Sequence, residues 1–136
     1  MSNPCDPDWL SWGCVVYQLK RLGGEPIVPP EISGQITPDI ETQINTRLNE
    51  RLVDVPASSL ADRVLIVEEV LRESRLFEAA LPFSRAIPRL IELDNPRRVD
   101  ILSVALQNEG RSLDALNRTL EANRVFALQR HVASLK

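Results

Sequence analysis

The chain has 136 residues, of which 43% are hydrophobic and 26% charged, a composition that excludes global disorder and is typical of one globular domain. Its formal net charge of −3 excludes a strongly basic nucleic-acid-binding protein as the default, but residues 97–136 hold 7 Lys and Arg against 4 Asp and Glu, while residues 1–96 hold 9 against 15. No apolar run approaches the roughly 18 residues of a membrane span and no signal peptide is visible, so we expect a cytoplasmic location without a membrane partner.

The first predicted element is an apolar helix over residues 6–22. Asp6 is suited to cap it, Pro7 to occupy its first position, and Gly23 and Gly24 to end it. Its apolar side chains cover well over half of the helical wheel, whereas a surface helix needs a stripe of only about 100°. Aromatic residues are enriched at the centres of protein interfaces, so we expect this helix to bind a protein partner or a second copy of the chain. The predicted partner-binding residues are Trp9, Trp12, Val16, Tyr17 and Leu19.

An extended arm is predicted next, over residues 23–37, with its Pro-rich part near residues 25–36. This part contains three prolines and one glycine, which disfavour a regular helix. Its isoleucine and valine side chains are too apolar for a free linker. We therefore expect the arm to lie along a surface, either its own or that of another chain.

Residues 38–136 are expected to form a helical bundle. Thr37 is predicted to cap its first helix, in which Ile40, Ile44, Leu48 and Leu52 repeat every four residues along one face. Pro56 is expected to end this segment.

Prolines and a glycine set the other predicted boundaries. A long helix is predicted over residues 60–81, stopped or kinked by Pro82, with a short helix from Ser84 to about residue 93. A further helix over residues 97–109 is expected to close at Gly110, after which Ser112 caps the last helical element. No segment alternates as a strand does, so the predicted fold is a single all-α domain over residues 1–136, a bundle of about six helices with one extended arm.

The last element has two interpretations, because its apolar residues form two faces. The first face contains Leu113, Leu116 and Leu120, and the second contains Val125, Leu128, Val132 and Leu135. The two faces are rotated by about a quarter turn or more. A break at Glu121–Asn123 would explain this rotation. An unbroken helix from Ser112 to Leu135 would instead make the stretch a packing element, which is the interpretation we favour.

The segment 96–136 contains RRVDIL, then EGRSLDAL, then a short polar stretch and a final helix. In this order it resembles the three-helix core of bacterial helix-turn-helix regulators. The resemblance implies a DNA-binding regulator whose last helix enters the major groove, where Arg and Gln side chains pair with base edges. The residues that would face the groove are Arg124, Gln129, Arg130, His131 and Ser134.

A second resemblance comes from an internal repeat. An offset of 36 residues aligns SRLFEAALPFSRA (74–86) with GRSLDALNRTLEA (110–122). The second copy, with its preceding LSVALQNE, resembles a tetratricopeptide unit. That resemblance implies a protein-binding groove and an adaptor or chaperone role. Pro82 and Pro88 depart from the pattern, and ordinary helical packing explains the same Leu and Ala positions.

Nothing in the sequence indicates a reaction centre. Cys5 and Cys14 would lie about 13 Å apart on a continuous helix, beyond the roughly 7 Å that a disulfide spans, so Cys5 is expected to be a free thiol and Cys14 a small buried residue. The charged residues Glu68, Glu69, Arg72, Glu73 and Arg75 are expected to form one solvated face. No phosphate-binding loop, zinc motif or nucleophile motif is present, so we predict no catalytic residue, cofactor, metal site or small-molecule substrate.

The predicted function is that of a small non-enzymatic protein for protein–protein interaction or assembly, a class that includes adaptors and viral or phage components. It would act through the N-terminal helix and the arm, and it would form a homo-oligomer. The alternative is a helix-turn-helix DNA-binding regulator that uses residues 96–136.

Overall fold

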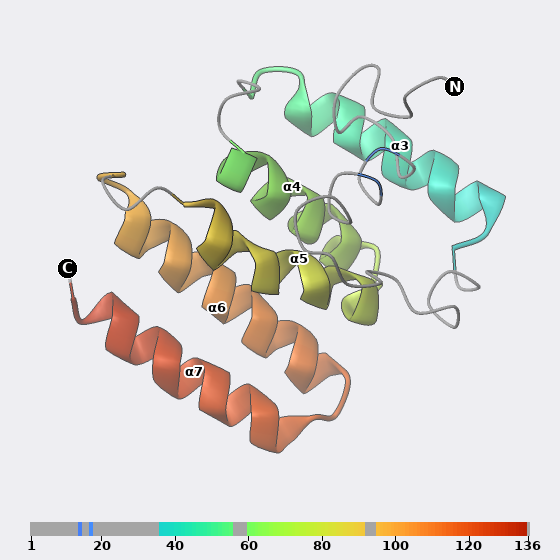
Figure 1. Ribbon diagram of the computed structural model, residues 1–136. Coiled ribbons are helices and arrows are strands. Elements are labelled where there is room, and N and C mark those ends of the chain that lie inside the picture. Colours follow the sequence, from blue (N-terminus) through green and yellow to red (C-terminus); the bar gives the residue numbers. More distant parts are fainter. Residues whose placement is uncertain (1–13, 15–16, 18–35, 56–59, 92–94, 136) are drawn as a thin grey trace.

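The computed structural model describes residues 14, 17, 36–55, 60–91 and 95–135. In these ranges the secondary structure consists of helices and no strand occurs, which confirms the all-α prediction (Figure 1). The helices are α3 (Pro38–Leu52), α4 (Leu60–Glu73), α5 (Phe77–Leu90), α6 (Arg98–Ala115) and α7 (Thr119–Ala133). Neither the predicted arm nor most of the predicted helix over residues 6–22 falls within the described residues.

The helices pack mainly as neighbours in chain order. α3 lies against α4, α4 against α5, α5 against α6 and α6 against α7, and α4 also reaches α6. As a result α3 and α7 lie at opposite edges of the bundle (Figure 1). None of the helices in the described ranges is both long enough and apolar enough to cross a membrane.

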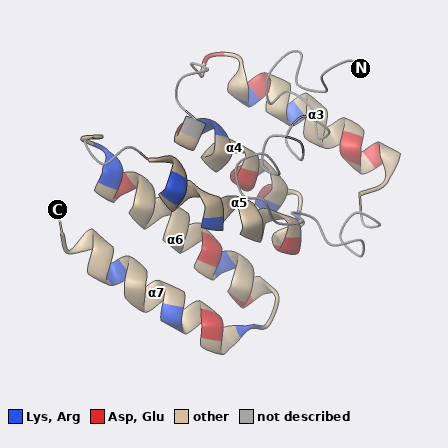
Figure 2. Ribbon diagram, viewed as in Figure 1, with Lys and Arg blue, Asp and Glu red and all other residues tan. Residues whose placement is uncertain are grey.

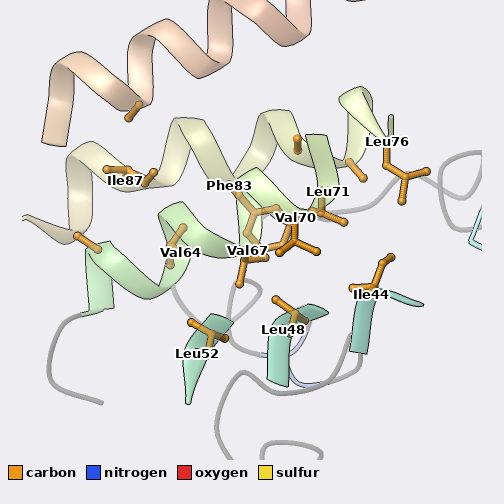
Figure 3. Packing of buried hydrophobic residues seen from close by; sticks show 14 of the residues in the cluster. Ile44, Leu48, Leu52, Val64, Val67, Val70, Leu71, Leu76, Phe83 and Ile87 are labelled. Atoms are coloured by element: carbon orange, nitrogen blue, oxygen red, sulfur yellow. The ribbon is translucent and has the colours of Figure 1, made fainter. Parts of the chain in front are cut away.

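The start of α3 agrees with its sequence signals. The Thr37 hydroxyl accepts a hydrogen bond from the Ile40 backbone N–H at 3.3 Å, and Pro38 occupies the first turn, where its missing N–H costs nothing. The four-residue stripe predicted for this helix is the buried one. Its side chains Ile44, Leu48 and Leu52 point toward α4 and meet Val64, Val67 and Val70 in the core (Figure 3).

α4 ends at Glu73, eight residues before the predicted stop at Leu81. The chain turns at Arg75, whose φ of 62° is left-handed. The Leu76 N–H donates to the Leu71 carbonyl at 2.9 Å and the Arg75 N–H to the Arg72 carbonyl at 3.0 Å. This pair of bonds is a Schellman motif, which satisfies the last carbonyls of a helix, and burial of Leu76 and Leu71 in the core completes it. The predicted helix over residues 60–81 is therefore wrong, because an arginine takes the position that glycine usually holds.

The same turn recurs between α6 and α7. Asn117 has a φ of 62°, the Arg118 N–H donates to the Leu113 carbonyl at 2.9 Å, and the Asn117 N–H donates to the Asp114 carbonyl at 3.0 Å. Arg75 and Asn117 thus hold equivalent places in two helical hairpins, α4–α5 and α6–α7. The structural repeat therefore has the offset that separates Arg75 from Asn117. This offset differs from the 36 residues that align Ser74 with Gly110 in the sequence.

Pro82 and Pro88 lie inside α5, which corrects the prediction that Pro82 stops a helix and that Ser84 starts another. A proline within a helix removes one backbone hydrogen bond and disfavours the preceding turn. Burial of one face of α5 offsets this cost. The buried residues are Ala79, Ala80, Leu81, Phe83, Ser84 and Ile87.

α6 runs through Gly110 and Ser112 without a break. The predictions that Gly110 closes a helix and that Ser112 caps the next are both wrong. Gly110 instead lies in close contact with α7: a Cβ at this position would lie 2.5 Å from the Phe126 ring. The Ser112 hydroxyl is buried and has no hydrogen-bond partner.

The break in the last element falls at Leu116–Arg118. The predicted break at Glu121–Asn123 is therefore misplaced, and the favoured interpretation of an unbroken helix from Ser112 to Leu135 is wrong. The turn at Asn117 divides the first predicted face: Leu113 belongs to α6, whereas Leu120 belongs to α7 with Val125 and Leu128.

We expect Gly110→Ala to lower the free energy of unfolding by about 1–3 kcal/mol, because the Phe126 ring must move to admit the new methyl group. The higher helix propensity of alanine, about 1 kcal/mol, acts in the opposite direction and is the smaller effect. Urea denaturation of Gly110→Ala, Phe126→Leu and the double variant measures the coupling between the two sites. Simple additivity of the two single effects would contradict the close approach.

We expect Arg75→Gly to raise the free energy of unfolding by about 0.5–1 kcal/mol, since a left-handed backbone is strained for arginine and not for glycine. Asn117→Gly should change it by less, because asparagine tolerates this conformation. Arg75→Ala keeps the strain and is the control for loss of the side chain. An equal gain in Arg75→Ala and Arg75→Gly in thermal or urea denaturation would show that the backbone is not the cause.

Candidate functional site

The inner face of α7 packs against α6. Ala122 is buried, and Val125 and Phe126 are partly buried around a small cluster with Leu113 of α6 and Leu81 of α5. The Gln129 side chain also points inward, and its Nε2 donates to the Ser103 hydroxyl at 2.9 Å. These contacts fix which side of α7 faces the rest of the protein.

The outer face of α7 carries large apolar side chains in solvent. Leu120 is 68% exposed, Leu128 51% and Leu135, just past the helix end, 61%. At 3.6 residues per turn these three positions fall within an arc of about 80°. Arg124 and His131 lie in the same arc, between the leucines, and both are exposed. We call these five residues the α7 outer stripe.

Positive charge predominates around this stripe. In the described part of α7 the one carboxylate is Glu121, which Arg118 holds through two hydrogen bonds of 2.7 and 3.0 Å. These hydrogen bonds lower the pKa of Glu121. Arg124 and Arg130 form no ion pair with any described residue. Figure 2 shows the resulting pattern, with basic segments along α7 and an acidic one near its start.

The five residues predicted to face DNA do not share one face of α7. Arg124, Arg130, His131 and Ser134 are exposed, but Gln129 turns toward α6 and is held by Ser103. The Ser134 hydroxyl donates to the His131 carbonyl within the same helix end at 2.6 Å. The structure therefore offers exposed arginines in this region, without the glutamine that the resemblance placed beside them.

Most of the predicted partner-binding residues lie outside the described residues, namely Trp9, Trp12, Val16 and Leu19. Tyr17 is described, and it is helical and exposed. Its exposure is compatible with a contact surface on this segment, and the surface itself stays a prediction.

Cys14 is helical and fully buried, as predicted, but it is disulfide-bonded, which the sequence argument excluded. The sequence contains one other cysteine, Cys5, which lies outside the described residues. The expectation assumed a continuous helix over residues 6–22, and the distance argument holds only under that assumption. Disulfides persist in oxidising compartments, so this bond does not support the cytoplasmic location predicted from the sequence.

Glu68 is the main buried charge in the described core. Its carboxylate accepts from Asn108 of α6 at 2.9 Å and from Arg72 at 3.2 Å, and the side chain is fully buried. Burial raises the pKa of Glu68 to about 7, against the opposing effect of Arg72. The expectation of a solvated face is therefore wrong for this residue. Its place three and four residues from Leu71 and Val64, on the apolar face of α4, is the signal in the sequence.

A second carboxylate, Glu109, is partly buried beside Arg85, with 3.6 Å between Oε2 and Nε. Burial raises the pKa of Glu109 despite the arginine. A second acidic group lies near each carboxylate, Glu69 near Glu68 and Glu121 near Glu109, and each adds a smaller upward effect on the pKa. Among the described residues no group of three or more His, Cys, Asp or Glu could hold a metal ion.

The raised pKa of Glu68 predicts that the protein loses stability as pH rises. The protonated carboxyl is favoured in the folded state, so its contribution is full below the unfolded pKa of 4.5 and is lost as pH rises through about 7. The loss is on the order of 3 kcal/mol. Urea denaturation of Glu68→Gln should give a free energy of unfolding that changes less between pH 5 and pH 8 than that of the wild type.

Glu50→Gln, at an exposed position on α3, is the matched control for removal of one carboxylate. If Glu68→Gln and the wild type show the same pH dependence, burial does not perturb the Glu68 carboxyl and the prediction fails.

The helical arrangement bears on both sequence resemblances. α6 and α7 lie side by side along their lengths in a tight hairpin (Figure 1), whereas the paired helices of a helix-turn-helix cross at about 90–120°. Two stacked hairpins are compatible with a tetratricopeptide-like unit, but with a different spacing from the one that the alignment suggested. A comparison with protein-family models finds no match, and comparisons with curated proteins and with solved structures find none either.

Proposed function

We propose that this protein is a non-enzymatic helical protein that works by binding other proteins, and that the outer face of α7 is one of its contact surfaces. The observation that carries the proposal is the alignment of Leu120, Leu128 and Leu135 on one exposed stripe. Single exposed leucines are common on protein surfaces, but an apolar stripe along an edge helix is typical of an interaction site.

The opposite edge of the bundle provides an internal comparison. α3 is also an edge helix, and it buries one apolar face against α4. Its outer face is polar from Pro38 to Leu52, with Asp39, Thr42, Gln43, Thr46, Asn49 and Glu50 exposed, and it carries one exposed apolar side chain, Val53, just past its end. An edge position therefore does not by itself explain the leucines of α7, which favours a contact made outside the chain.

The α7 stripe adds a second surface to the one predicted on the N-terminal helix. Two separate surfaces would suit an adaptor or an assembly component, which binds more than one partner at a time. Self-association through the N-terminal helix, and a viral or phage role, remain predictions from the sequence.

The proposal predicts position-specific cross-linking in cells of the source organism. A photoreactive amino acid at Leu128 should cross-link to one or a few defined proteins, identified by mass spectrometry, because this side chain would lie within the contact. The same amino acid at Val53, which is 72% exposed just past the end of α3, is the matched control and should not give these products. No product at Leu128, or the same products at both positions, would contradict the proposed function.

A further inference from the structure

The α7 outer stripe alternates apolar and basic or imidazole side chains along one line. In chain order it reads Leu120, Arg124, Leu128, His131 and Leu135, with steps of three or four residues that keep all five on one face of the helix. All five side chains are exposed. A partner that covers the leucines therefore also covers Arg124 and His131, and it must provide groups that accept hydrogen bonds from them.

The stripe has no carboxylate of its own to meet Arg124. Glu121 lies beside the stripe, where Arg118 holds it through hydrogen bonds and Arg124 acts on it only at longer range. Arg124 has no ion-pair partner among the described residues. A guanidinium that is covered without a counter-charge loses its hydration at a cost of several kcal/mol, so the partner should provide the acid.

A second copy of α7 does not meet this requirement. An antiparallel pair centred near residues 127 and 128 would place Leu120 opposite Leu135, but it would also place Arg124 opposite His131. A parallel pair would place Arg124 against its own copy. Both arrangements bury arginine without a carboxylate, which disfavours the pair.

A flat anionic lipid surface also fits poorly. Helices that lie on membranes have an apolar face that enters the lipid and basic residues on the polar side, from where they reach the headgroups. In α7, Arg124 and His131 lie in line between the leucines. A membrane that buried Leu120, Leu128 and Leu135 would bury these two polar groups with them.

We propose that the α7 outer stripe binds an acidic amphipathic helix of a partner protein. This inference rests on the proposed function and adds the chemistry of the partner. Arg124 and His131 are seven residues apart, about 10.5 Å along the helix axis. Two carboxylates seven residues apart on the partner helix match this spacing in either chain direction, and apolar residues between and beyond them cover the three leucines.

The test uses the full chain and a fluorescein-labelled helical peptide that carries Leu, Glu, Leu, Glu and Leu at the spacings of the α7 outer stripe. Fluorescence anisotropy should show saturable binding to the wild type. We expect Arg124→Glu and Leu128→Ser each to weaken it about tenfold or more. A second peptide with Lys in place of Glu should bind the wild type weakly and Arg124→Glu better.

Arg111→Glu is the matched control, since it makes the same charge change at an exposed position on α6 and should leave binding of the Glu peptide unchanged. Circular dichroism of each variant checks that the fold is kept. Equal binding of the Glu and Lys peptides, or an Arg124→Glu protein that still binds the Glu peptide, would overturn the inference. So would tighter binding to phosphatidylserine vesicles than to the peptide, or a dimer in analytical ultracentrifugation that Leu128→Ser dissociates.

The two proposals fail in different ways. Suppose that Leu128 cross-links to a defined protein but the Glu and Lys peptides bind equally well. The proposed function would then be supported, and the inference that the partner is an acidic helix would be wrong. Absence of any partner at Leu128 would contradict the proposed function itself.

Discussion

The close approach of α6 and α7 at Gly110 sets the orientation of the helix that carries the candidate site. Only a residue without a side chain leaves room for the Phe126 ring, which lies where a Cβ of residue 110 would be. With Phe126 and Ala122 turned inward, the geometry of the helix turns Leu120, Leu128 and Leu135 outward. The exposed leucines therefore follow from a packing constraint on the opposite side of α7. A glycine that looks like a helix terminator in the sequence is the residue on which this surface depends.

The parts of the fold that follow from the sequence are those in which local signals and burial agree. Thr37 and Pro38 start α3 where a cap and a first-turn proline predict it, and the four-residue stripe of that helix is its buried face. The turns at Arg75 and Asn117 carry no such signal, because neither is a glycine and their left-handed backbone is maintained by the hydrogen bonds and packing of the hairpins. In α5 the burial of one face offsets the cost of two prolines inside the helix. Sequence rules that use only neighbouring residues do not predict this.

The candidate site could be predicted from the sequence only in part. The two apolar faces of the last 25 or so residues were visible in the sequence, but their rotation was compatible both with a break and with the unbroken helix that we favoured. Whether Leu128 and Leu135 face α6 or solvent depends on the register of the hairpin, which Asn117 and Gly110 set. Glu68 shows the same limit: its charge suggested solvent, but its position beside Leu71 and its contact with Asn108 place it between α4 and α6.

The attachment of α7 to the bundle gives a partner a way to affect the whole domain. In α7 Ala122 is the buried side chain, and the other inner contacts, at Val125, Phe126 and Gln129, are only partly buried. Few buried apolar contacts indicate that this helix has a lower local stability than α4 or α5. A ligand that binds only the docked helix stabilises it by a free energy that grows with the logarithm of its concentration over its dissociation constant. A partner bound to the outer face of α7 would therefore also stabilise the packing of its inner face. Through Leu113 and Leu81 this stabilisation would extend to α6 and α5.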